Sequence, residues 1–265
     1  MPNTDLLLYL DHLDFDAAGP RAALALARRM GSRLDALYVA DLPAAAFSLP
    51  ESVPVQLEET RRRCLDAEAH AGSWQSLLTA HGLHGSWRVA QGDTVQTVCQ
   101  AASGYDLLIM ERSQQRSDAP VGFGTVSRSV FGTGRPVLVV PGDIETISSI
   151  GARILVAWNG SRESILALAA AVPLLQHCED VLVLDGSEMN QESIAVLPPP
   201  GLADWLQRRG VQARIKPIDA GPAHAHRADM IVMGAWSRSR LAQMVLGGTT
   251  RHLFMHSDLP MFVAH

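Results

Sequence analysis

The 265-residue chain repeats one pattern of apolar segments in its two halves. Asp106–Glu111 (DLLIME) matches Asp229–Gly234 (DMIVMG) at an offset of 123 residues. A second match joins Pro136–Val140 (PVLVV) to Pro260–Ala264 (PMFVA). Because solenoid repeats are much shorter, a repeat of this length predicts two copies of one domain.

We expect the domains to span residues 1–143 and 151–265, with a polar, turn-rich linker at Pro141–Gly151. In both, short apolar runs alternate with helical patterns, which predicts a parallel sheet covered by helices on both faces. The expected strands are Leu6–Asp11, Asp35–Ala40, Trp87–Ala90, Asp106–Met110, Val137–Val140, Ile154–Asn159, Val181–Asp185, Val211–Pro217, Asp229–Gly234 and Pro260–Ala264. The expected helices are Ala17–Gly31, Gln56–His81, Thr94–Ala102, Ser164–Leu175, Gly201–Arg209 and Thr249–His256.

The charge balance excludes several classes of function. A net charge of −5 disfavours non-specific nucleic-acid binding, which needs a basic face. The single lysine, Lys216, is followed by Pro217, whereas a Walker A loop needs Lys followed by Ser or Thr. The usual protein-kinase signature set is also missing.

The expected compartment is the cytoplasm. Cys64, Cys99 and Cys178 form no CxxC pair, so we interpret them as reduced thiols. The amino-terminal residues lack the pattern of a signal peptide, and we expect no membrane span, because the longest uncharged apolar stretch, Ser164–Cys178, is too short.

The most informative segment is Gly234–Thr250, GAWSRSRLAQMVLGGTT, which follows a strand and leads into an expected helix. Gly247 and Gly248 would let the backbone approach a ligand closely, and Thr249 and Thr250 would supply hydroxyls and N–H groups at a helix amino terminus. Spacing alone leaves two interpretations open: a phosphate-binding loop, or a tight turn between strand and helix.

This segment resembles the universal stress protein family, whose nucleotide-binding members carry Gly-x2-Gly-x9-Gly-(Ser/Thr) after the fourth strand. Gly234 matches the first glycine and Gly247 the third, while Ser237 replaces the second and Gly248 stands where Ser or Thr is usual. The resemblance covers essentially the whole chain twice, as in tandem members, and includes the words ILVAWNGSRES and GGTTRHLFMHSDLPMFVAH.

The resemblance implies two Rossmann-like (flavodoxin-like) α/β domains, each with a five-stranded parallel sheet. It further implies ATP, with Mg²⁺ as a candidate companion ion, at the carboxyl ends of the strands of domain 2. The nucleotide-binding residues would be Asn159, Leu184, Met233, Gly234, Ser237, Gly247, Gly248, Thr249 and Thr250. Asn159 stands where the family usually has an acidic residue, and it keeps a carbonyl acceptor without the charge.

The first half departs further from the family's motif. Glu111 and Gln114 occupy the two leading glycine positions, whereas Gly124 and the following residues keep the distal part. A carboxylate at position 111 would repel phosphates or would itself use the backbone amides. We therefore expect no nucleotide in domain 1.

The resemblance also implies pairing through the last strand of each domain, here Val137–Val140 and Met261–Ala264, in an internal pseudo-dimer. A homodimer of the whole chain stays open. His252 and His256 lie four residues apart on an expected helix, but with no third ligand at hand we expect no metal site.

We find no positioned general base and expect no catalytic residues, so any ATP hydrolysis should be slow. The predicted function is stress-associated sensing of adenine nucleotides. The alternative is a stress scaffold that binds protein partners and no nucleotide.

Overall fold

A computed structural model describes residues 4–42, 53–112, 124–144, 147, 149–186, 201–217, 227–235 and 257–265. Its first half contains, in chain order, β1 (Asp5–Leu10), α1 (Ala18–Met30), β2 (Arg33–Asp41), α2 (Val53–Ala69), α3 (Ala71–Ala80), β3 (Trp87–Gly92), α4 (Thr94–Ala102), β4 (Leu107–Arg112), α5 (Thr125–Gly132) and β5 (Val137–Pro141). The second half contains β6 (Arg153–Trp158), α6 (Arg162–Leu175), β7 (Asp180–Asp185), α7 (Leu202–Gln207), β8 (Arg214–Pro217), β9 (Met230–Gly234) and β10 (Met261–Ala264).

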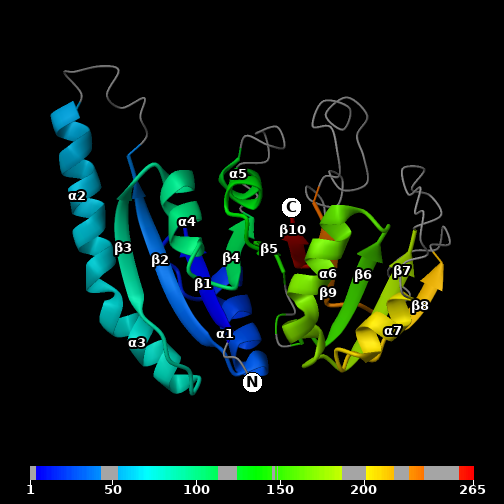
Figure 1. Ribbon diagram of the computed structural model, residues 1–265. Helices are drawn as coiled ribbons and strands as arrows, with labels where there is room; N and C mark the ends of the chain where they lie inside the picture. The colour runs from blue at the N-terminus through cyan, green and yellow to red at the C-terminus, as the bar shows by residue number, and fades with distance from the viewer. Residues whose placement is uncertain are drawn as a thin grey trace.

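The strands form one continuous sheet in the order β3-β2-β1-β4-β5-β10-β9-β6-β7-β8 (Figure 1). Each half contributes five parallel strands in the same relative order. The expected α/β class is therefore confirmed, and all ten expected strands are present within one or a few residues of their expected ends.

The two halves meet through β5 and β10, which pair antiparallel with Phe262 opposite Leu138. These are the two strands expected to pair. Because both are fully buried in the middle of the sheet, the apolar edge of each half is covered inside one chain. A side-chain contact reinforces the junction, since Nη2 of Arg112 donates to the carbonyl oxygen of Ser257 at 2.7 Å.

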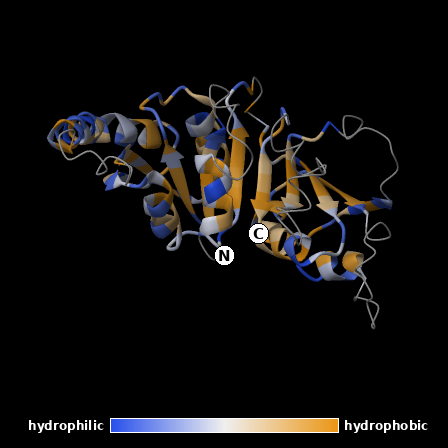
Figure 2. Ribbon diagram, turned by 90° about the horizontal axis from the view of Figure 1, so that it is seen from above, coloured by the Kyte–Doolittle hydropathy of each residue, from blue (hydrophilic) through white to orange (hydrophobic). Residues whose placement is uncertain are grey.

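Hydrophobic residues make up most of the strands along the middle of the molecule (Figure 2). Alternate residues divide between two core clusters: Leu6, Leu8 and Leu10 belong to the one that includes residues of α1, α3, α6 and α7, and Leu7 to the one that includes residues of α4 and α5. The first half thus carries helices on both faces. In the described part of the second half, the helices lie on one face.

One expected helix, Gln56–His81, is wrong in its length, because the chain breaks at His70 into α2 and α3. The carbonyl oxygen of Ala67 accepts from Nε1 of Trp87 at 2.9 Å, and the His70 ring meets the carbonyl oxygen of Asp66 at 2.9 Å. Side chains therefore take bonds that a continuous helix would make with its own N–H groups. The expected helix Thr249–His256 lies outside the described residues.

Candidate functional site

The candidate site lies where the carboxyl ends of β9, β6 and β7 meet. β6 lies between the other two strands, and the chain order reverses across β6 and β9. Ligands of open α/β sheets bind at such a reversal, outside the carboxyl ends of the strands. Four predicted site residues are described here, namely Asn159, Leu184, Met233 and Gly234.

Leu184 and Met233 lie in one row across the sheet, with Ala157 between them. Ala157 is the register partner of Leu184 on β7 and of Met233 on β9. All three side chains belong to the same face of the sheet. Because alanine has the smallest side chain of the three, the row forms a shallow depression at Ala157. A depression between two apolar side chains suits the flat apolar base of a nucleotide.

Gly234 ends β9 against the first turn of α6. A Cβ atom at position 234 would come within 2.5 Å of the carbonyl carbon of Glu163 and the nitrogen of Ser164. Real Cβ atoms do not make such contacts, so only glycine lets the strand and the helix approach this closely. Gly234 therefore sets the close packing of β9 on the first turn of α6, a helix end that carries N–H groups without a helical partner and partial positive charge.

Asn159 is exposed and helps to form the turn from β6 into α6. Its Oδ1 accepts from the N–H of Ser161 at 3.1 Å. Ser161 is the N-cap of α6, and its Oγ accepts from the N–H of Ser164 at 3.2 Å. Asn159 therefore fixes the local turn in this structure, in addition to lying at the predicted position.

The other predicted nucleotide-binding residues lie outside the described part of the chain. They are Ser237, Gly247, Gly248, Thr249 and Thr250. The candidate metal pair, His252 and His256, lies there too. Their roles stay predictions.

At the corresponding place in the first half, the glycine is on the helix and the strand carries a glutamate instead. Glu111, at the position of Gly234, directs its carboxylate at α1, where Oε2 accepts from the N–H of Gly19 at 2.7 Å. The missing Cβ is here on the helix, because a Cβ at Gly19 would lie 3.1 Å from both Cβ and Oε2 of Glu111. Of the two outcomes expected for a carboxylate at position 111, the structure shows its use of a backbone amide.

The row across the sheet also differs in the first half. Tyr9 is the register partner of Leu37 on one side and of Met110 on the other, so it takes the place of Ala157. A phenol ring thus stands where the second half has a methyl group. In the first half, the Tyr9 ring therefore fills the depression that Ala157 leaves in the second half.

Acidic side chains surround Glu111. Burial raises the pKa of Glu111, and the nearby Asp11 and Asp14 add to this, while the Gly19 N–H and His12 oppose it. Burial lowers the pKa of His12, but its hydrogen bond with Asp11 and the surrounding carboxylates outweigh this and raise it overall. This environment would repel a phosphate chain.

Sequence reasoning missed Ala157, Tyr9 and Gly19. The signal was present, because aligning LLLYLD with ILVAWN places Tyr9 opposite Ala157. Spacing does not reveal that Gly19 faces Glu111, which is 92 residues away along the chain.

Two classes of site find no support in the part of the chain that the structure describes. No group of three or more His, Cys, Asp or Glu side chains there could hold a metal ion. Among the same residues, no helix is long and apolar enough to cross a membrane.

Comparison with known sequences indicates one family. The sequence model of the Universal stress protein family matches residues 6–141 and 206–265. The universal stress protein Slr1230 of Synechocystis sp. is 23% identical, over 97% of this chain and 98% of its own length.

Solved structures give the same result for the fold. The crystal structure of a universal stress protein from Archaeoglobus fulgidus superposes with a TM-score of 0.71 at 17% identity, covering 98% of this chain and 95% of the other. A putative universal stress protein from Pseudomonas aeruginosa gives 0.59 at 15% identity, covering 99% and 93%. The likeness extends over both halves.

Proposed function

Because this chain belongs to the universal stress protein family, we propose that it is a stress-response protein whose second half binds an adenine nucleotide, with ATP as the ligand. We take residues 1–143 and 151–265 as its two domains and the cytoplasm as its compartment. The observation that supports nucleotide binding most directly is the apolar row of Leu184, Ala157 and Met233 at the reversal of chain order, where ligands of such sheets bind.

The residues of the second half fit this ligand. The row of Leu184, Ala157 and Met233 would receive the base, and the amino terminus of α6 would lie toward the phosphates. Mg²⁺ would enter with the nucleotide, since the phosphates are its usual ligands. The residues of the first half do not fit, because Glu111 and Tyr9 stand at the corresponding places.

A scaffold without a nucleotide is the second candidate. It is favoured by one specific observation, the hydrogen bond that directs Oδ1 of Asn159 to Ser161 within its own turn. In that case the exposed surface of the protein, rather than this edge, would carry the function.

Calorimetric titration of the full chain with ATP, with and without Mg²⁺, separates the candidates. We expect saturable binding of one ATP per chain, weakened at least about tenfold by Gly247→Val. The matched control is Gly124→Val at the corresponding position of the first half, where a Cβ would meet only Oγ of Ser127 at 3.8 Å. This control should bind as the wild type does. Absence of binding at millimolar ATP would favour the scaffold.

A further inference from the structure

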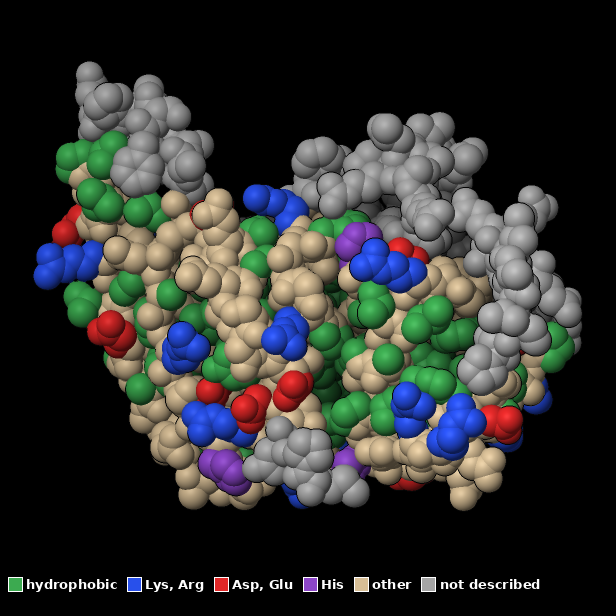
Figure 3. Space-filling model, viewed as in Figure 1, with side chains coloured by type: hydrophobic (Ala, Val, Ile, Leu, Met, Phe, Trp, Pro, Cys, Tyr) green, Lys and Arg blue, Asp and Glu red, His purple; other side chains and the backbone are tan. Residues whose placement is uncertain are grey.

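Helix α6 is apolar on its outer side as well as on its inner side. From Ser164 to Gln176 it contains no charged residue. Its inner side is buried, yet Ile165 and Leu166 are 49% and 40% exposed, and Ala169 and Ala170 are exposed as well. Figure 3 shows hydrophobic side chains gathered over α6 on the face toward the viewer. A helix that is apolar all round is typical of a helix covered on both sides.

The fold itself does not require this surface. Helix α1 contributes to the same core cluster in the first half, and its buried side is likewise made of alanine and leucine. The outer side of α1, however, carries the exposed charges of Arg21 and Arg28. The apolar outer side of α6 is therefore a property of this sequence at this place.

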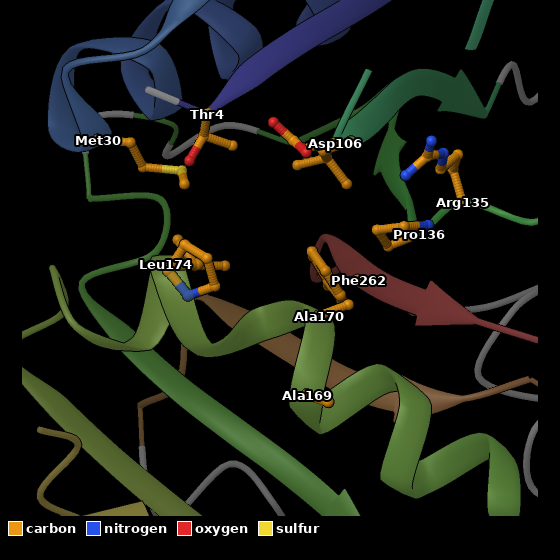
Figure 4. A pocket seen from close by; sticks show the side chains of 11 residues that line it. Thr4, Met30, Asp106, Arg135, Pro136, Ala169, Ala170, Leu174 and Phe262 are labelled. Carbon is orange, nitrogen blue, oxygen red and sulfur yellow. The ribbon is translucent and has the colours of Figure 1, made fainter. Parts of the chain in front are cut away.

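A groove of about 330 Å³ lies beside the exposed residues of α6. Ala169 and Ala170 form one wall, while Asp106 and Arg135 lie on the opposite wall, and Phe262 lies between them (Figure 4). Pro173 of α6 also lines the groove. The small alanine side chains leave this space open. The large side chains of Ile165 and Leu166 thus lie about one helical turn away from this groove. The groove has room for side chains of their size.

We propose that a second copy of this chain covers the outer side of α6. The two α6 helices would lie antiparallel about a two-fold axis near Ala169 and Ala170. Each copy would then insert Ile165 and Leu166 into the groove of the other. A two-fold interface needs a surface that complements itself, and a projection and a hollow on one helix face meet that condition.

Charge supports the same arrangement. Arg162 is exposed at the end of α6 that carries Ile165, and Asp106 and Arg135 are both exposed on the opposite wall of the groove. The guanidinium of Arg135 donates to the carbonyl oxygen of Ser103 at 2.7 Å, which leaves Asp106 as the partner for Arg162. An antiparallel pairing brings the arginine of one copy toward the aspartate of the other, twice per dimer. The groove also continues the junction within the chain, because Phe262 belongs to β10. A stable dimer buries about 800 Å² per copy, so the residues flanking α6 must contribute beside the helix.

The mass of the full chain in solution tests the proposal. Sedimentation velocity from about 1 to about 100 μM should show the wild type shifting from the 28.6 kDa monomer to a species of twice that mass. Ala170→Glu places a charge at the centre of the interface and should keep the chain monomeric throughout. The matched control is Leu65→Glu on α2, where the side chain is 60% exposed, and it should dimerise as the wild type does.

A second variant tests the position of the axis. Ala169→Cys should give a disulfide-linked dimer when an added oxidant such as copper phenanthroline accepts the two electrons, whereas the wild type and Leu65→Cys should not. A wild type that stays monomeric up to 100 μM overturns the proposal. So does a dimer that Ala170→Glu leaves intact, or one in which Ala169→Cys does not cross-link.

Discussion

Oε2 of Glu111 accepts a hydrogen bond from the N–H of Gly19 at 2.7 Å, and so joins the end of β4 to the amino terminus of α1. In the second half, Gly234 ends the equivalent strand and touches the backbone of Glu163 and Ser164. In the first half the strand carries the glutamate and the helix carries the glycine, whereas in the second half the glycine is on the strand. Each half joins strand and helix closely, but only the second leaves the helix end clear of a strand carboxylate.

Removing the Glu111 carboxylate should destabilise the first half. Glu111→Ala leaves the N–H of Gly19 without its acceptor, which we expect to cost about 1–2 kcal/mol of the free energy of unfolding. Glu111→Gln keeps an acceptor at the same place and should cost less. Urea denaturation at pH 7 checks both variants, and equal losses would show that the hydrogen bond contributes little.

Gly234→Ala should be strongly destabilising, because its Cβ would lie within 2.5 Å of the backbone of α6. We expect a loss of about 1–3 kcal/mol, as for other overpacked sites. Gly72→Ala in α3 is the control, since a Cβ there meets nothing within 4 Å and alanine favours a helix. The midpoints of urea denaturation of the two variants should therefore move in opposite directions.

Ala157→Tyr should abolish nucleotide binding without unfolding the chain. The substitution copies the first half, where Tyr9 fills the corresponding place between Leu37 and Met110. The measurement is ATP titration by calorimetry together with circular dichroism. Unchanged ATP affinity in a folded Ala157→Tyr variant would mean that the base does not bind over this row.

Asp229 should make stability depend on pH. It is nine-tenths buried, Oδ2 accepts from the N–H of Arg153 at 3.0 Å, and burial raises its pKa to about 6. Between its unfolded value near 3.8 and this value, the folded state holds a proton that the unfolded state lacks. Asp229 therefore favours folding at about pH 4, and this contribution is lost as the pH rises to 6.

Two substitutions isolate that effect. Asp229→Asn should remove the part of the pH dependence between about pH 4 and pH 6 that Asp229 causes. Asp106→Asn is the matched control, because Oδ2 of Asp106 accepts from the N–H of Asp5 at 2.9 Å in the same arrangement at an exposed position. If both variants keep the wild-type pH dependence, Asp229 does not titrate in this range.

The two halves should unfold together, because β5 and β10 join them and one core cluster contains residues of both. Phe262→Ala removes a side chain that is 2% exposed, and we expect it to cost about 3–5 kcal/mol. Fluorescence should show one transition at a lower denaturant concentration, since Trp74 and Trp87 report on the first half and Trp158 and Trp205 on the second. Two separate transitions would contradict this coupling.

Much of the fold could be predicted because its signals are local. Continuous apolar runs mark the strands, and Gly31 adopts the left-handed conformation that ends α1, with φ 62°. The break at His70 could not be predicted in this way, because the bond from Trp87 that accompanies it comes from a strand about twenty residues further along the chain. The site divides similarly: a motif predicts Gly234 and an alignment of the two halves points to Ala157, whereas Gly19 matters only through Glu111, 92 residues further along the chain.

The sequence by itself determined the family, the α/β class and the duplication, since these depend on periodicity and short motifs that survive in each half. Glu111 also predicted a first half without a nucleotide, but only the tertiary structure decided how its carboxylate is used, namely as the acceptor of the N–H of Gly19. That contact depends on which helix residue faces position 111, just as the packing of Gly234 depends on Glu163 and Ser164 across the strand and the helix. Such contacts arise when distant segments pack together, so the order of residues along the chain does not display them.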